Sequence, residues 1–182
     1  MDRESLYISL LKQEVSLAVG CTEPIAVALA CAVCRKVLDH PKDTDTPCER
    51  IDLVLSRNII KNAMGVGIPG TGMAGIPIAA ALGYFGGDPD AGLEVLSRTS
   101  EEAMRRAKAL TESQAVHVTR FSGSKPLYIE AKITSAGHTA RVVIERTHDR
   151  VTRIEKDGTV VKDEPAGAEA GGEPEIRTAS LA

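Results

Sequence analysis

A cysteine at the start of an apolar helix is the first residue whose type and position could do chemistry. The segment GCTEP, residues 20–24, places Cys21 directly before the apolar run IAVALACAVC. A helix N-terminus lowers the pKa of a thiol through the helix dipole and the free N–H groups, so Cys21 could be a thiolate at neutral pH. A small buried cysteine without a chemical role is the alternative, and the residues alone leave both open.

The second candidate is the glycine-rich passage NAMGVGIPGTGMAG, residues 62–75. It contains G-x-G-x-x-G, but Pro69 interrupts the pattern, and no acidic residue closes a second parallel strand about 20 positions later, as a dinucleotide site requires. Met73 and Ala74 replace the Lys and Ser/Thr of a phosphate-binding Walker loop. The passage therefore matches neither nucleotide fingerprint.

Anion binding remains a chemical use for this passage. Its glycines let backbone N–H groups approach a ligand, and a helix N-terminus expected between Met73 and Ile76 favours negative charge. The hydroxyl of Thr71 is a further donor, and three polar residues lie just upstream: Asn58, Lys61 and Asn62. A carboxylate is the predicted ligand. Tight helix packing through the glycines is the alternative, and it stays open.

The other cysteines and the histidines carry weaker signals. Cys31 and Cys34 lie within the apolar helix, and only Cys48 could join them, whereas zinc and iron–sulfur sites want four ligands. We therefore predict core packing for Cys31 and Cys34, a surface thiol at Cys48, and no metal site in this chain. His148 follows Thr147 at the end of a predicted strand and is the best acid–base or ligand candidate; a solvated turn histidine is the alternative.

Composition excludes several classes of partner. The net charge is −3 over 182 residues, and only five residues are aromatic, so a nucleic-acid surface is not expected. No window reaches the roughly 18–20 apolar residues of a membrane span. The N-terminus lacks the basic flank and cleavage pattern of a signal peptide, which predicts a cytoplasmic protein.

Hydrophobic periodicity predicts the elements that position these residues. Helices are expected over residues 4–19, over 23–39 with Thr22 as N-cap, from Ile76 to the glycines at 86–87, and up to about Leu110 with Thr99 and Glu102 in a capping box. Strands are expected over residues 50–56, 116–118, 127–133, 140–144 and 151–154. These elements predict an α+β fold, in which a helical front half packs on a mostly antiparallel sheet of about four or five strands.

The domain boundary is predicted at residue 161. Residues 1–161 form the predicted domain, and residues 162–182, with the stretch KDEPAGAEAGGEPE, have little to bury and read as a flexible linker or tail.

Taken together, four segments resemble a known family. GCTEPIAVALA, SRNIIKNAMGVGIPGTGMAGIPIAAALG, GLEVL and THDRVTRIE occur in the order found in the N-terminal region of the iron–sulfur L-cysteine desulfidases. Those enzymes are relatives of the alpha chain of bacterial iron–sulfur L-serine dehydratases. The resemblance covers residues 14–158, and GCTEP together with PGTGM is its most specific part.

The resemblance implies a lyase that removes sulfide from L-cysteine, or water from L-serine, to give pyruvate and ammonia. It also implies a [4Fe-4S] cluster whose open iron acts as a Lewis acid on the leaving group. Cys21 would act in proton transfer, and His148 matches a histidine after the third late strand. The residues expected to hold the substrate carboxylate are Asn58, Lys61, Asn62, Thr71 and Gly72.

The resemblance also implies that this chain is incomplete as an enzyme. Members of the family are much longer than 182 residues, and their cluster-ligating cysteines lie in a C-terminal half without a counterpart here. We therefore expect no cluster in this chain alone, no activity in isolation, and a missing C-terminal domain or partner subunit, with a homodimer as a candidate assembly. The alternative function is a non-catalytic module that binds a small carboxylate or a protein partner.

Overall fold

The computed structural model describes residues 7–8, 20–43 and 45–164. Except for residues 7 and 8, the helix predicted over residues 4–19 lies outside the described residues. The same is true of residues 165–182, which make up most of the predicted linker.

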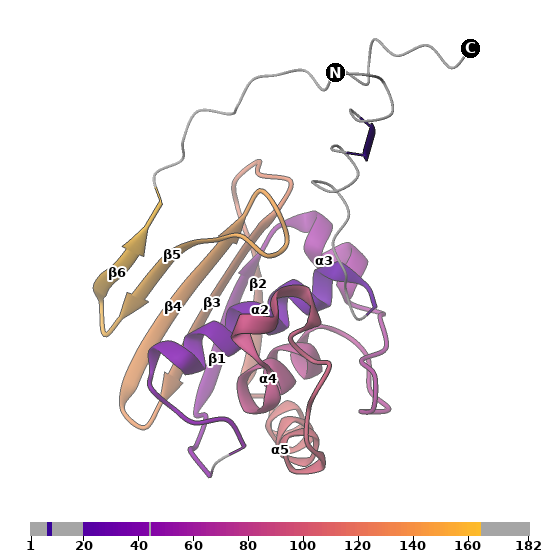
Figure 1. Ribbon diagram of the computed structural model, residues 1–182, viewed down its shortest axis with the longest axis vertical. Helices are drawn as coiled ribbons and strands as arrows, with labels where there is room; N and C mark the ends of the chain where they lie inside the picture. The colour runs from indigo at the N-terminus through magenta and orange to yellow at the C-terminus, as the bar shows by residue number, and fades with distance from the viewer. Residues whose placement is uncertain (1–6, 9–19, 44, 165–182) are drawn as a thin grey trace.

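A six-stranded sheet in the order β2-β1-β3-β4-β5-β6 forms the larger layer (Figure 1). Strands β1 and β2 are parallel, and every other neighbouring pair is antiparallel. The predicted α+β class and the mostly antiparallel sheet are thus confirmed. The strands are β1 (Arg50–Leu55), β2 (Val116–Arg120), β3 (Tyr128–Ser135), β4 (His138–Glu145), β5 (Val151–Lys156) and β6 (Thr159–Asp163).

The strand count exceeds the predicted four or five because β6 pairs with β5 after the turn at Asp157-Gly158. Its two valines, Val160 and Val161, are adjacent in the sequence and both exposed. The segment therefore lacks the alternation of apolar and polar residues by which a half-buried strand is predicted. The sheet consequently ends at Asp163, two residues beyond the predicted domain boundary at 161.

The helices gather on one side of the sheet (Figure 1). Helix α2 packs against β3 and β4 and also against α4, which in turn packs against α5. The helical elements are α2 (Thr22–Val37), α3 (Arg57–Ala63), α4 (Ile76–Gly86), the 3₁₀ segment η1 (Pro89–Glu94) and α5 (Glu101–Glu112). Every helix in the described part of the chain falls short of the length and apolar character that a bilayer span requires.

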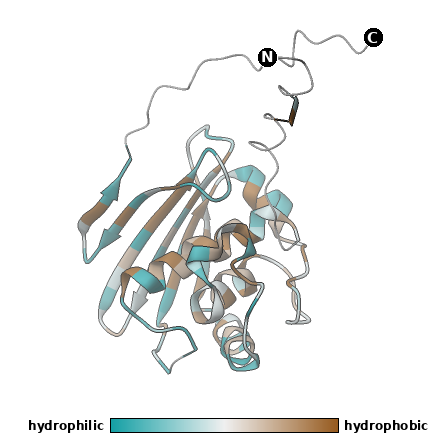
Figure 2. Cartoon of the chain, in the orientation of Figure 1, coloured by the Kyte–Doolittle hydropathy of each residue, from teal (hydrophilic) through white to brown (hydrophobic). Residues whose placement is uncertain are grey.

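Alternation along the strands separates an apolar face from a charged one, as the banding in Figure 2 shows. In β3, Ile129, Ala131 and Ile133 are buried towards the helices. On the opposite face, three ion pairs join neighbouring strands and a fourth lies within β5, with nitrogen–oxygen distances of 2.6–2.9 Å. The residues of this ion-paired face are Glu130, Arg141, Arg153, Glu155 and Asp163.

Two predicted helix starts are wrong by one residue. Cys21, not Thr22, is the N-cap of α2, because Cys21 has extended backbone angles while Thr22 is already helical. Ser100, not Thr99, caps α5, and its Oγ accepts a hydrogen bond from the Ala103 N–H at 3.1 Å. Helix α2 also ends at Val37 rather than at residue 39, where Asp39 has a φ of 59° and cannot continue the helix.

The contact between α2 and α4 is unusually close at one glycine. A Cβ atom built on Gly83 would lie only 2.2 Å from the carbonyl oxygen of Ala28 and 2.6 Å from its Cα. Both neighbouring atoms belong to the backbone of α2, so they cannot move aside as a flexible side chain would. The two helices therefore pack backbone against backbone at this point.

We predict that Gly83→Ala destabilises the protein by about 1–3 kcal/mol, because the added methyl group forces α2 and α4 apart. The measurement is the free energy of unfolding from urea denaturation. Gly65→Ala is the matched control, since a Cβ there meets no atom within 4 Å and Gly65 is exposed. Equal stabilities for the two variants would contradict the close packing of α2 and α4.

Candidate functional site

A carboxylate in the first turn of α2 joins two segments of the chain through hydrogen bonds. The Cys21 thiol donates to Glu23 Oε2 at 2.9 Å, and the Thr22 hydroxyl donates to the same oxygen at 3.3 Å. From α3, the Asn62 amide Nδ2 donates to Glu23 Oε1 at 2.9 Å. We call Cys21, Glu23 and Asn62 the thiol–carboxylate cluster.

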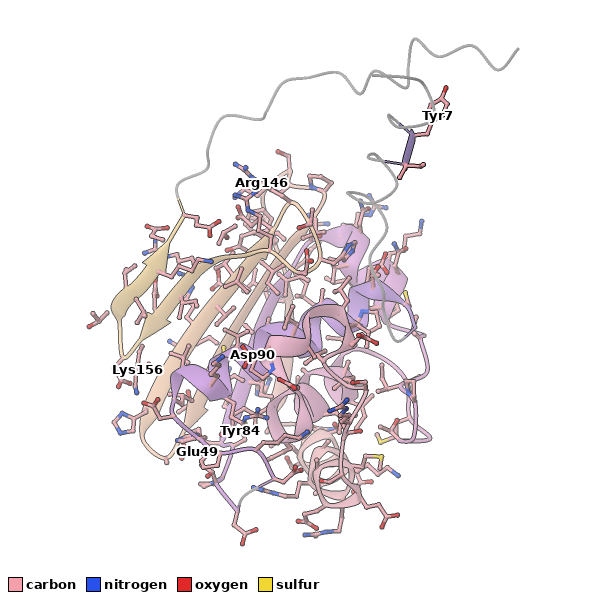
Figure 3. The ribbon with its side chains drawn as sticks, in the orientation of Figure 1. Tyr7, Glu49, Tyr84, Asp90, Arg146 and Lys156 are labelled. Atoms are coloured by element: carbon pink, nitrogen blue, oxygen red, sulfur yellow. The ribbon has the colours of Figure 1, made fainter. Side chains whose placement is uncertain are left out.

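His148 lies close enough to this cluster to act on its charge. It is half-buried in the turn between β4 and β5, and its electrostatic interaction with Glu23 is one of the influences that lower the pKa of that carboxyl. Figure 3 shows Arg146, from the same turn, at the end of the sheet opposite Glu49 and Lys156. That is the end where β1 finishes and α3 begins, so the fold brings the predicted residues Cys21, Asn62 and His148 to one region.

Glu23 is held as a carboxylate. Partial burial alone would raise its pKa, but the hydrogen bonds donated by Cys21 and Asn62, together with His148, lower the pKa to about 2. Sequence reasoning did not single out Glu23 as a site residue. The available signal was an acidic residue in the first turn of a helix, where negative charge is favourable, directly beside the candidate cysteine.

Of the two interpretations that the sequence left open for Cys21, the activated thiolate disagrees with the surroundings of this thiol. Burial and the hydrogen bond to the Glu23 carboxylate both raise the pKa of the Cys21 thiol, and the negative charge of Glu23 adds to the effect. These influences outweigh the backbone N–H of Glu23, which alone lowers the pKa. Cys21 is therefore a protonated hydrogen-bond donor at neutral pH.

The glycine-rich passage folds back on itself. The Ile68 N–H donates to the Met73 carbonyl oxygen at 2.9 Å, and the Gly75 N–H donates to the carbonyl oxygen of Val66 at 2.9 Å. Gly67 and Ala74 form an isolated antiparallel bridge. The passage is thus a closed loop with its own backbone hydrogen bonds.

Thr71 stabilises this loop and does not point at a ligand, contrary to the prediction. Its side chain is buried, its hydroxyl donates to the Ile68 carbonyl oxygen at 2.7 Å, and its Oγ1 accepts a hydrogen bond from the Met73 N–H at 3.0 Å. Gly72, beside it, is exposed and has a φ of 67°, which suits a tight loop. The Thr71 hydroxyl therefore has no spare donor for a carboxylate.

The first turn of α4 also differs from the predicted anion site. Gly75 is its N-cap, and a Cβ there would lie 2.9 Å from the Met64 carbonyl oxygen. Gly75 and Ile76 are buried, and Pro77 has no N–H to offer. Close packing, the alternative that the sequence left open, accounts for Gly75 better than an anion does.

The predicted polar residues on α3 separate into different environments, although all of them are exposed. Asn62 belongs to the thiol–carboxylate cluster, whereas Asn58 lines a groove beside Arg57. Among the described residues, the Lys61 ammonium group has no hydrogen bond or ion pair. The structure therefore brings together only part of the predicted carboxylate-binding set.

Two of the remaining cysteines match their predictions and one does not. Cys31 and Cys34 are fully buried, and the Cys34 thiol donates to the Ala131 carbonyl oxygen at 3.5 Å. Cys48 is half-buried against the core rather than on the surface, and burial raises its pKa to about 12. Within residues 20–43 and 45–164, no group of three His, Cys, Asp or Glu side chains could hold a metal ion.

The first prediction from this geometry concerns thiol reactivity. Replacing Glu23 by Gln removes the negative charge beside Cys21, so the pKa of the thiol should fall and alkylation by iodoacetamide near neutral pH should accelerate. The measurement is the alkylation rate as a function of pH, with Cys21→Ser identifying the reacting thiol. Asn58→Ala is the control, because Asn58 lies outside the cluster. An unchanged or slower rate in Glu23→Gln would contradict the assigned hydrogen bond.

The second prediction concerns acid stability. The pKa of Glu23 is about 2 in the fold against its ordinary value of 4.5. A lowered pKa contributes stability that is fully present above the unfolded value and is lost as the pH falls through the folded value. Wild type should therefore exceed Glu23→Gln in unfolding free energy by a margin that is constant above about pH 5 and shrinks towards pH 2. Urea denaturation across this range measures the margin; a pH-independent margin would contradict the assignment.

Comparison with known proteins identifies relatives that are named UPF0597 proteins. The chain is 44% identical over 161 residues to a UPF0597 protein of Oleidesulfovibrio alaskensis, 48% identical over 158 residues to one of Aeromonas salmonicida, and 43% identical over 175 residues to one of Aeromonas hydrophila. These alignments cover 88%, 87% and 95% of this chain but 36%, 34% and 38% of the relatives. No protein-family model matches the chain, and no solved structure matches it. The chain thus spans about a third of the length of the curated relatives it matches.

Proposed function

We propose that this chain is the N-terminal part of a [4Fe-4S]-dependent lyase that eliminates sulfide from L-cysteine, or water from L-serine, to give pyruvate and ammonia. The observation that carries the proposal is the thiol–carboxylate cluster with His148 beside it. The cluster and His148 together come from three of the segments on which the resemblance rests, and those segments are far apart in the sequence. Their convergence supports a shared chemical role.

The groups in this region are suited to moving a proton. An elimination requires a base for the α-proton and an acid for the leaving group. Cys21 carries a proton on Sγ, Glu23 is ionised beside it, and the imidazole of His148 can accept or donate a proton. In the proposal, Cys21 and His148 handle protons at the substrate.

Glu23 and Asn62 act as positioning residues. Glu23 fixes the direction of the Cys21 S–H bond, and Asn62 fixes the second carboxylate oxygen, so the thiol is held in one orientation. Asn62 belongs to α3, whose other polar residues, Asn58 and Lys61, are exposed and available to a substrate carboxylate. Thr71 is not part of this proposal, because its hydroxyl is used within the loop.

Cys31, Cys34 and Cys48 do not fit as ligands of an iron–sulfur cluster. Cys31 and Cys34 are buried in the apolar core, where their sulfur atoms have no open side for iron, and Cys48 packs against the same core. We therefore assign no step to a cluster within this chain. In the proposal, the cluster ligands lie in the remainder of a longer protein, and the chain's coverage of about a third of its relatives is consistent with that arrangement.

The test is to exchange segments with a longer relative. The aligned segment of the Aeromonas salmonicida protein is replaced by this chain, and the hybrid is purified anaerobically with iron and sulfide. We expect pyruvate from L-cysteine or L-serine with the hybrid and none with the 182-residue chain alone. Cys21→Ser in the hybrid should lower the rate about a hundredfold or more, as expected for loss of a proton-transfer group.

Cys48→Ser in the same hybrid is the matched control, because this cysteine lies outside the cluster; its rate should remain close to that of the parent. The unaltered relative is assayed first. Absence of pyruvate from the relative, activity of the isolated chain with a stoichiometric cluster, or an unaffected Cys21→Ser hybrid would each contradict the proposal.

A further inference from the structure

A groove of about 370 Å³ lies at the carboxyl ends of the parallel strands β1 and β2. Arg57 and Asn58, at the start of α3, line it on one side. Arg120, the last residue of β2, and the segment that follows line it on the other. None of the residues of the thiol–carboxylate cluster lines this groove, so it is a separate feature. The lining residues of the following segment are Phe121, Gly123, Ser124, Lys125 and Pro126.

The groove carries positive charge that no described residue neutralises. Among the described residues, the guanidinium groups of Arg57 and Arg120 have no hydrogen bond or ion pair. Lys125 is already paired with Glu145 at 2.5 Å, and within the described part of the chain no acidic residue lines the groove. Two uncompensated charges therefore face one open space.

The walls of the groove are fixed in position by backbone contacts. The Phe121 N–H donates to the Leu55 carbonyl oxygen at 2.8 Å, and the Ser56 N–H donates to the Tyr128 carbonyl oxygen at 2.9 Å. The buried Ser56 hydroxyl donates to the Pro126 carbonyl oxygen at 3.0 Å. These bonds connect the β1–α3 junction to both ends of the segment 121–126, so the groove is formed before any ligand arrives.

An aromatic pair supports the same segment. The Phe121 ring stacks on Tyr128 with a centroid distance of 4.0 Å and an interplanar angle of 18°. A Cβ on Gly123 would lie 2.4 Å from the Phe121 ring, so the chain passes directly over the ring at this residue. The groove therefore has an apolar wall beside its cationic donors.

We propose that this groove binds the phosphate group of a small phosphate monoester. Guanidinium groups bind phosphate through paired hydrogen bonds, and the Ser124 hydroxyl offers a further donor. A phosphate monoester carries a charge of about −1.5 to −2 at neutral pH, which matches the charge of the two unpaired arginines. A single carboxylate carries only one negative charge and would leave one arginine without a counter-charge. The volume exceeds that of a phosphate group and leaves room for its organic substituent against Phe121. This proposal does not depend on the lyase proposal.

The test is a titration of the 182-residue chain with glycerol phosphate, inorganic phosphate and acetate at low ionic strength, followed by calorimetry and by amide chemical shifts. We expect saturable binding of glycerol phosphate, weaker binding of inorganic phosphate, and the weakest binding of acetate. The amide signals of Gly123 and Ser124 should move on binding. Arg57→Ala and Arg120→Ala should each weaken the binding of glycerol phosphate about tenfold, since each removes charge-assisted hydrogen bonds.

Arg98→Ala is the matched control. Arg98 is also exposed and lies outside the groove, so its loss changes the net charge equally without touching the site. An equal loss of affinity in Arg98→Ala, or saturable binding that survives the double variant of Arg57 and Arg120, would overturn the proposal. So would the absence of saturable glycerol phosphate binding, or tighter binding of acetate than of either phosphate. Circular dichroism establishes that each variant is folded before its titration is interpreted.

Discussion

The rest of the structure depends on the burial of α2. One of its sides lies against β3 and β4 and another against α4, and every residue from Pro24 to Arg35 is buried. Such complete enclosure requires a close neighbour, which the glycine at position 83 of α4 permits. Because α2 cannot shift within this packing, its first turn is held in a fixed position relative to the sheet. The packing of α2 therefore fixes the positions of Cys21 and Glu23.

Helix α3 connects the two regions for which we propose a function. Asn62 belongs to the thiol–carboxylate cluster, and Asn58, four residues earlier, lines the groove that contains Arg57 and Arg120. Residues four apart lie about 6 Å from each other along a helix axis and on the same side of it. A ligand that moved α3 would therefore reach both regions at once. The short helix follows β1 directly, so its position is set by the centre of the sheet rather than by a long loop.

Much of the fold follows from local sequence, because its main elements have strong periodicity. The continuous apolar run of α2 predicted a buried helix with Cys31 and Cys34 in the core, and the period of two after residue 115 predicted four of the strands. The missed elements lack such signals. In α3 only Ile59 and Ala63 are buried, and β6 is an edge strand with two exposed valines. Hydrophobic periodicity arises from burial, so it does not predict an element that buries few side chains.

The candidate site was less predictable because its chemistry depends on contacts between distant segments. The position of Cys21 before a helix was read correctly, yet the Glu23 carboxylate and burial reverse the expected direction of its pKa. Thr71 was read as a ligand-binding hydroxyl, although its nearest acceptor lies three residues away in its own loop. Arg120 and Arg57 meet only because β1 and β2 are parallel neighbours, separated by about sixty residues of chain. No local pattern contains that pairing.

The ion-paired face of the sheet limits what can cover it. Arg141 pairs with Glu130 and Glu155, and Arg153 pairs with the same Glu155 and with Asp163, so the charges alternate across β3, β4, β5 and β6. An apolar surface packed against this face would desolvate all of these charged groups without offering them hydrogen bonds. A neighbouring domain or subunit that covers this side must therefore be polar itself, or leave a layer of water between the two surfaces.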